Sequence, residues 1–159
     1  MASPDPEPRP GWDEYYLALA DMTARRSPCL SRQVGCVIVS GGRIIATGYN
    51  GPPSGIPHCG ECARKRAPGA GWEVCRAIHA EQNAILSCAR SGTAVRDATL
   101  YCTCFPCSVC ARMILNLDVR RIVFRAPYPD QLSRILLAER GFALRGGDGF
   151  FAYGREGGE

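Results

Sequence analysis

The sequence contains no run of eighteen apolar residues, which excludes a membrane-spanning helix. Its N-terminus also lacks the basic-then-apolar pattern of an export signal, so we expect a cytoplasmic protein. Aromatic residues make up only 8% of the chain, and the arginines are scattered along it instead of forming a basic stripe. Stable binding to nucleic acid is therefore not expected.

The composition that remains is that of an ordinary globular protein. The 159 residues are 46% hydrophobic and 21% charged, which predicts a single domain with one core. The formal net charge of +4 suits an anionic small molecule without requiring a polynucleotide. We expect the domain at 12–145, between a disordered Pro-rich tail at 1–11 and a Gly-rich tail at 146–159. The aromatic residues of the second tail either stay loose or dock on the domain or on another subunit: Phe150, Phe151 and Tyr153.

Hydrophobic periodicity predicts alternating helices and strands. Strands are expected at 34–39, 43–47, 98–102, 121–124 and 142–144, the first two joined as a hairpin by a glycine turn. Helices are expected to begin near Trp12, His79, Pro106 and Leu132. This alternation is typical of a layered α/β sheet.

Two short motifs carry candidate chemistry. His79 and Glu81 open one apolar helix, and Pro106, Cys107 and Cys110 open the next. Cys107 and Cys110 are three apart, so both sulfurs lie on one helix face, near the positive helix N-terminus that favours thiolates. With His79 they provide three ligands for tetrahedral zinc and leave a fourth position for water, as in catalytic zinc sites. Glu81 is a poor ligand beside soft thiolates, so we interpret it as a proton shuttle.

A loop of more than twenty residues, 52–74, has no periodicity and must be tied down in a compact domain. Cys59 and Cys62 lie inside this loop, and Cys75 closes it. The chain has ten cysteines, some of them paired at two-residue spacing, and no export signal. Metal binding is therefore favoured over disulfides, and we expect a second metal ion in the loop.

The order of the two motifs is typical of zinc nucleobase deaminases. From Trp12 to Leu144 the sequence resembles the cytidine and deoxycytidylate deaminase superfamily, and within it the deoxycytidylate (dCMP) deaminases. The resemblance is carried by Trp12-Asp13-Glu14-Tyr15-Tyr16, by Arg26-Ser27 ahead of Gln33-Val34-Gly35, by Gly48-Tyr49-Asn50-Gly51-Pro52-Pro53-Ser54-Gly55 and by His79-Ala80-Glu81-Gln82-Asn83-Ala84-Ile85. It implies a three-layer α/β/α fold with a five-stranded mixed sheet flanked by helices. It also implies a homo-oligomer, often a hexamer.

The activity that the resemblance implies is hydrolytic deamination of dCMP to dUMP with release of ammonia. Zinc held by His79, Cys107 and Cys110 would activate a water molecule. Glu81 would take the water's proton and deliver protons to the ring nitrogen and the departing amine.

The resemblance also implies a set of substrate contacts. Backbone groups around Ala80 and Phe105 would orient the base, and Asn50 would hydrogen-bond the 3′ hydroxyl. Arg26-Ser27 is the candidate for the 5′ phosphate, because an arginine fork suits phosphate oxygens. Tyr128 is a candidate to close the pocket.

Relatives from phages and prokaryotes often carry a second zinc. The resemblance places Cys29 and Cys59 at two of its ligand positions, with Cys62 and Cys75 completing four thiolates and His58 as a substitute ligand. Such a closed site would be structural and would pin the long loop. The remaining cysteines are expected to behave as small buried hydrophobes: Cys36, Cys88, Cys102 and Cys104.

Several alternatives remain open from the sequence. Some dCMP deaminases respond to dCTP and dTTP through the Gly-Tyr-Asn-Gly region, so both nucleotides are candidate effectors. Few side chains separate dCMP from another cytosine nucleotide or nucleoside as substrate. A deaminase of tRNA or of another polynucleotide would use the same zinc and Glu81 but would need a basic or aromatic surface. A zinc-stabilised binding module would have no need of Glu81.

Overall fold

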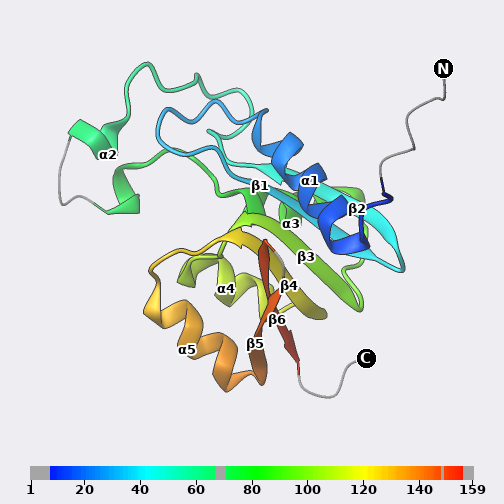
Figure 1. Cartoon of the computed structure of the whole chain (residues 1–159). Helices are drawn as coiled ribbons and strands as arrows, with labels where there is room; N and C mark the ends of the chain where they lie inside the picture. The colour runs from blue at the N-terminus through cyan, green and yellow to red at the C-terminus, as the bar shows by residue number, and fades with distance from the viewer. Residues whose placement is uncertain (1–7, 67–70, 148, 156–159) are drawn as a thin grey trace, which may run out of the picture.

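The computed structural model describes residues 8–66, 71–147 and 149–155. Its centre is a mixed six-stranded sheet in the order β2-β1-β3-β4-β6-β5 (Figure 1). The pair β3 and β4 is parallel, and the other neighbouring strands are antiparallel. The strands are β1 (Gly35–Ser40), β2 (Arg43–Tyr49), β3 (Ala98–Cys104), β4 (Val119–Ala126), β5 (Phe142–Gly147) and β6 (Phe150–Arg155).

Helices cover both faces of this sheet. The helix α1 (Trp12–Ala24) packs on one face, and α3 (Ala80–Ser91), α4 (Ser108–Ile114) and α5 (Gln131–Glu139) pack on the other. Between β2 and α3 the chain makes a long excursion with the short helix α2 (Ala63–Arg66) and the 3-10 turn η1 (Trp72–Val74), which extends away from the sheet (Figure 1). None of the helices in the described part of the chain is long and apolar enough to cross a membrane.

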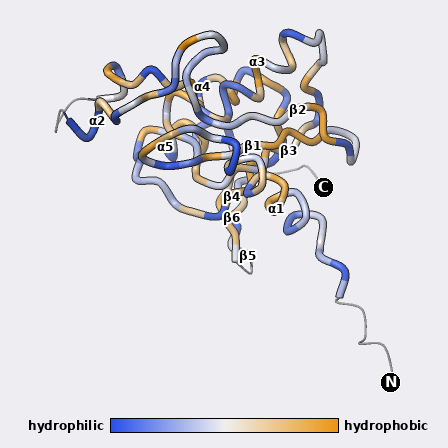
Figure 2. Tube along the Cα trace, turned by 90° about the horizontal axis from the view of Figure 1, so that it is seen from above, coloured by the Kyte–Doolittle hydropathy of each residue, from blue (hydrophilic) through white to orange (hydrophobic). Residues whose placement is uncertain are grey.

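The two cores follow from alternation along the strands. In β1, Val37 and Val39 face α1, while Cys36 and Ile38 face the helices of the opposite side. Because successive side chains of a strand point to opposite faces, one apolar strand serves both cores. Figure 2 accordingly shows hydrophobic residues along the central strands. The expected three-layer α/β/α arrangement is confirmed.

The expected number of strands is corrected from five to six. The additional strand, β6, lies in the stretch expected to form a Gly-rich tail, and it inserts between β4 and β5. Its residues Ala152 and Tyr153 are buried, and Tyr153 stacks near Phe105 and Phe124. The glycines of this stretch favour a flexible tail, but the aromatic side chains between them bury enough apolar surface to hold β6 in the sheet.

Close packing of helices against the hairpin depends on two glycines. A Cβ atom at Gly35 would collide with the backbone of Ala20 in α1, and one at Gly48 would collide with the backbone of Ala80 in α3. Hydrogen would be the only side chain that fits at either position. The Gly48 of the Gly-Tyr-Asn-Gly motif therefore sets the distance between β2 and the helix that carries His79 and Glu81.

The four cysteines expected to be structural are confirmed as such. All are buried within the core, and Cys36 lies opposite Cys102 in the β1–β3 ladder. Burial raises the pKa of the thiols of Cys36, Cys88, Cys102 and Cys104, which keeps them in the unreactive neutral form.

Candidate active site

His79 lies at the N-cap of α3, where the chain is fixed from both sides. Its backbone N–H donates to the side chain of Gln82 at 2.9 Å, a capping interaction within the first turn. The preceding residue, Ile78, exchanges two backbone hydrogen bonds with Gly51, at 2.8 and 3.1 Å. This bridge holds the start of α3 beside the loop that follows β2.

The two cysteines of the second motif lie at the start of α4. Cys107 is the N-cap residue and Cys110 is in the first turn, so Pro106 precedes the cap instead of occupying the first helical position. The expected placement of both thiols near the helix N-terminus is confirmed, with the helix beginning two residues later than the proline suggested. Cys110 is fully buried and Cys107 is partly exposed.

The three side chains converge on one point. The Nδ1 atom of His79 lies 3.4 Å from the Sγ atom of Cys107 and 3.4 Å from that of Cys110. Among the described residues this is the one group of three or more His, Cys, Asp or Glu side chains with ligand atoms all within 4.8 Å of one another. One imidazole nitrogen and two sulfurs form a donor set that suits zinc and leaves a fourth tetrahedral position.

The electrostatics of the group support the same conclusion. A hydrogen bond from the Cys110 thiol lowers the pKa of Cys107 to about 4, while that shared proton and burial raise the pKa of Cys110 above its ordinary value. The hydrogen bond to Cys107 also raises the pKa of His79. The lowered pKa of Cys107 favours the thiolate form that binds a metal cation.

Glu81 lies behind these ligands in the first turn of α3. Its side chain is buried, with a relative exposure of 4%, and this burial raises the pKa of the carboxyl. Glu81 is absent from the convergent group of ligand atoms within the described residues. A buried carboxyl with a raised pKa, close to a metal site but not part of it, is suited to accept and return protons.

The metal-ligand group opens into a cavity of about 130 Å³. Of the expected substrate contacts, Asn50, Phe105 and Tyr128 line it. Ala80, in α3, is completely buried and is not among the described residues that line this cavity. Other residues that line it include Arg32, Arg64, His79 and Cys107.

The expected phosphate contacts lie elsewhere. Arg26 is not among the described residues that line this cavity. Ser27 is buried, and its hydroxyl donates to the backbone and side-chain oxygens of Asn50 at 2.7 and 2.8 Å. Ser27 therefore orients Asn50. The side chain of Asn50 also accepts from Val34 N–H at 2.8 Å and donates to the Arg32 carbonyl at 2.9 Å, which leaves one amide N–H for a ligand.

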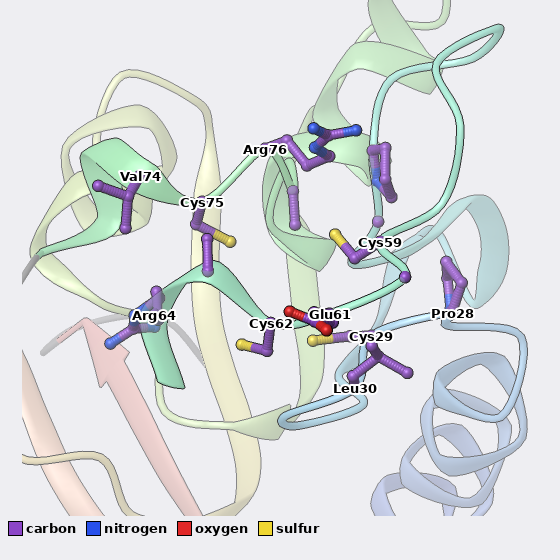
Figure 3. A pocket seen from close by; sticks show the side chains of 15 residues that line it. Pro28, Cys29, Leu30, Cys59, Glu61, Cys62, Arg64, Val74, Cys75 and Arg76 are labelled. Carbon is purple, nitrogen blue, oxygen red and sulfur yellow. The ribbon is translucent and has the colours of Figure 1, made fainter. Parts of the chain in front are cut away.

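The four cysteines expected at a second metal site surround another cavity, of about 260 Å³. Figure 3 shows the sulfurs of Cys59 and Cys75 pointing toward each other across it, with Cys29 and Cys62 on the same rim. Their ligand atoms do not form a group within 4.8 Å in the described part of the chain. His58, the expected substitute ligand, lines a different cavity, beside the Gly-Tyr-Asn-Gly motif.

A third cavity, of about 580 Å³, lies beside the Gly-Tyr-Asn-Gly motif. It is lined by Gly48, Tyr49, Gly51, His58, Asn83 and Arg90. The side chain of Asn83 in α3 donates to the carbonyl of Tyr49 at 2.7 Å, so the motif is fastened to the helix of the metal ligand.

Sequence reasoning missed two arginines and two positioning residues. Arg32 has no motif of its own, and Arg64 belongs to the basic run Arg64-Lys65-Arg66, which the sequence allows to bind a triphosphate but which is more typical of a solvated loop. Asp130 and Ser133 hold the turn around Cys107 from α5, a contact between distant segments that no local pattern predicts. The one sequence signal for this contact is Asp130 itself, because aspartate is a preferred N-cap residue and Asp130 stands directly before an apolar helix.

Helices on a mixed sheet, a His-Cys-Cys group at two helix N-termini and a buried glutamate form an arrangement that is typical of zinc-dependent nucleobase deaminases. Residues 10–126 match the family model described as the cytidine and deoxycytidylate deaminase zinc-binding region. The chain belongs to this family.

Two similar proteins differ in how much of their own length this chain covers. A deoxycytidylate deaminase of Schizosaccharomyces pombe is 39% identical over 143 residues, covering 86% of this chain and 44% of that protein. A deoxycytidylate deaminase of Mycobacterium phage D29 is 41% identical over 124 residues, covering 73% of this chain and 95% of that protein. This chain thus spans less than half the length of the fungal relative.

Among solved structures, the chain is similar to the dCMP deaminase of the cyanophage S-TIM5 in complex with dCMP and dUMP. The TM-score is 0.72 at 30% identity, covering 85% of this chain and 96% of that chain.

Proposed function

We propose that the protein catalyses the hydrolysis of dCMP to dUMP and ammonia. The observation that carries this proposal is the His79, Cys107 and Cys110 group with the buried Glu81 beside it, at a cavity that Asn50 lines. Relatives of similar length bear the name deoxycytidylate deaminase, and a similar structure binds dCMP and dUMP.

Each residue of the site has a defined task in this reaction. His79, Cys107 and Cys110 would hold zinc, which would supply Lewis acidity to the attacking water. Glu81 takes the two protons of that water in turn and delivers one to the ring nitrogen and one to the leaving amine, so that water and dCMP are converted to dUMP and ammonia with no other reactant. Burial raises the pKa of the Glu81 carboxyl, which makes its carboxylate a better acceptor for the water's proton.

The substrate contacts are proposed as follows. Backbone groups at Ala80 and Phe105 orient the base, and the unused amide N–H of Asn50 binds the sugar hydroxyl. Tyr128, which lines the same cavity, closes over the substrate.

The cysteine cavity is proposed to hold a second, structural zinc. Cys29, Cys59, Cys62 and Cys75 line one cavity from three separate stretches of chain, and four thiolates are the donor set of closed zinc sites. Metal binding would draw the four sulfurs together and fasten the excursion to the domain.

Regulation is proposed at the third cavity, and assembly is proposed through exposed apolar side chains. The cavity beside the Gly-Tyr-Asn-Gly motif has Arg90 in its lining and room for dCTP or dTTP as effector. Exposed apolar side chains on α3 and α5 support association into a homo-oligomer, for which a hexamer is the proposed form: Leu86, Leu132 and Ile135. Equilibrium binding of dCTP and the molar mass from light scattering test these two statements.

The activity is tested by ammonia release from a panel of substrates. The purified, zinc-loaded protein is offered dCMP, CMP, dCTP, deoxycytidine and a short single-stranded oligonucleotide. We expect turnover of dCMP with the highest kcat/KM. Turnover of the oligonucleotide alone, or of no member of the panel, would reject the proposal.

A further inference from the structure

Two arginines share the cavity of the metal ligands. Arg32, in the segment between α1 and β1, and Arg64, in α2, both line the cavity that also contains His79 and Cys107. Neither has a carboxylate oxygen within 4.0 Å among the described residues, whereas Arg66, two residues after Arg64 in α2, pairs with Glu61. Two guanidinium groups without a carboxylate partner among the described residues thus line a single small cavity.

Arg32 is held in place by three interactions. Its Nη1 atom donates to the Sγ atom of Cys104 at 3.4 Å, and its guanidinium carbon lies 5.9 Å from the ring centroid of Tyr128. Its backbone carbonyl accepts the hydrogen bond from Asn50. Only one of the five N–H donors of the guanidinium is used by Cys104. The group is oriented in advance and keeps a free fork for an anion.

The neighbouring backbone is equally well fixed. Gln33 donates through its side chain to the Ser27 carbonyl at 2.6 Å, and Ser27 in turn is bound to Asn50. The segment from Ser27 to Val34 is therefore a loop closed on Asn50, and it presents Arg32 to the cavity. The buried Ser27 hydroxyl serves this loop and is not available to a phosphate.

Arg64 lines the cavity from α2, in the segment between β2 and α3 that contains Cys59, Cys62 and Cys75. Residues of this excursion line both the metal-ligand cavity and the cysteine cavity: Cys62, Arg64, Cys75 and Ala77. Arg64 is two residues from Cys62, so anything that fixes Cys62 also limits where Arg64 can reach. The position of this arginine is thereby coupled to the cysteine cavity.

We propose that Arg32 and Arg64 bind the 5′ phosphate of a nucleoside monophosphate substrate, in place of Arg26 and Ser27. The inference deepens the proposed deamination and rests on it. Two guanidinium forks from separate segments of the chain match the charge and the oxygens of one phosphate monoester. They select a nucleoside monophosphate over the free nucleoside. One of the two phosphate contacts, Arg64, belongs to the segment between β2 and α3 that contains the cysteines.

The test compares dCMP with deoxycytidine in Arg32→Gln, Arg64→Gln and wild-type protein. Each substitution should raise KM for dCMP about 10-fold to 100-fold, the effect of losing one hydrogen bond to a charged group. We expect kcat for dCMP, and kcat/KM for deoxycytidine, to stay within about threefold of wild type, because neither depends on the phosphate contact. Arg32→Lys should recover part of the loss in KM, since it keeps the charge without the fork.

Arg66→Gln is the matched control, since Arg66 lies in the same helix, pairs with Glu61 and is not in the lining of the cavity. A KM for dCMP within about twofold of wild type in both the Arg32 and Arg64 variants would overturn the proposal. So would an equal loss for deoxycytidine, which would indicate a structural role, or a rise in KM confined to Arg26→Gln.

Calorimetric binding of the products separates this inference from the proposed activity. Wild-type protein should bind dUMP at least about 100-fold more tightly than deoxyuridine, and the two substitutions should remove most of that difference. This result would establish phosphate recognition even if dCMP were not turned over, and equal affinity of wild type for dUMP and deoxyuridine would overturn it.

Discussion

Asp130 and Ser108 join the two helices that lie behind the metal ligands. One carboxylate oxygen of Asp130 accepts the backbone N–H of Ser108, the first residue of α4, at 2.8 Å. The other accepts the N–H of Ser133 at 2.9 Å and so caps α5. The Ser133 hydroxyl donates to the carbonyl of Pro106 at 2.8 Å. Cys107 is therefore flanked on both sides by residues that α5 holds in place.

Replacing Asp130 by alanine should weaken both the fold and the metal site. Loss of the cap should lower the free energy of unfolding by about 1–2 kcal/mol. Loss of the support for Cys107 should lower the affinity for the catalytic zinc by about 10-fold to 100-fold. Urea denaturation and competition with a zinc-binding dye measure the two effects. Glu139→Ala, on the exposed end of the same helix, is the control and should leave both unchanged.

The contribution of Asp130 should depend on pH. Burial alone would raise the pKa of this carboxyl, but the N–H groups of Ser108 and Ser133 hold it below its ordinary value of 3.8. A depressed pKa stabilises the folded state above the unfolded pKa, and that contribution is lost as the pH falls through the folded pKa. In zinc-free protein, the stability difference between wild type and Asp130→Ala should thus shrink below about pH 4. A difference that stays constant from pH 7 to pH 3 would contradict the assignment.

Gly48→Ala should be disruptive for a reason unrelated to ligand binding. The new methyl group would collide with the backbone of Ala80 in α3, which cannot move without displacing His79 and Glu81. We expect a loss of at least about 2 kcal/mol in the free energy of unfolding, together with weaker zinc binding. Gly146→Ala, where a Cβ atom meets nothing within 4 Å, should change stability by less than about 1 kcal/mol. Equal denaturation midpoints for the two variants would refute this role of Gly48.

The catalytic metal group could be predicted from sequence because its geometry is local. His79 and the two cysteines each lie at a helix N-terminus whose position follows from apolar periodicity, and the spacing of Cys107 and Cys110 fixes one face. The pairing of the two motifs followed from the resemblance to a family. The position of the buried Glu81 beside the metal ligands could be predicted from its place two residues after His79 in the sequence.

The parts that could not be predicted depend on contacts between distant segments. The strand β6 pairs with β4, and its Tyr153 packs against Phe105. The stabilisation from these contacts outweighs the flexibility of the glycines around the strand. Arg32 is defined by Cys104 and Tyr128, residues that are 72 and 96 positions away in the chain. Arg26 and Ser27 had the right chemistry for phosphate, but the closed loop around Asn50 uses Ser27 for itself.

Cys75→Ser tests the proposed structural zinc. The wild-type protein should contain about two zinc ions per chain, and the variant about one. The catalytic zinc should remain, while proteolysis in the stretch 52–74 should become faster because the excursion is no longer fastened. Cys88→Ala, at a buried cysteine of the core, should keep both ions. One zinc per chain in the wild-type protein would remove the second site.

The most direct measurement is the rate of dUMP formation from dCMP by wild-type protein and by Glu81→Gln, with the zinc content of both determined in parallel. The amide has the shape of the carboxyl but cannot take up the proton, so we expect unchanged zinc at His79, Cys107 and Cys110 and a kcat at least about 1000-fold lower. A Glu81→Gln protein that retains its zinc and turns over dCMP within about tenfold of wild type would contradict the proton-transfer role on which the account rests.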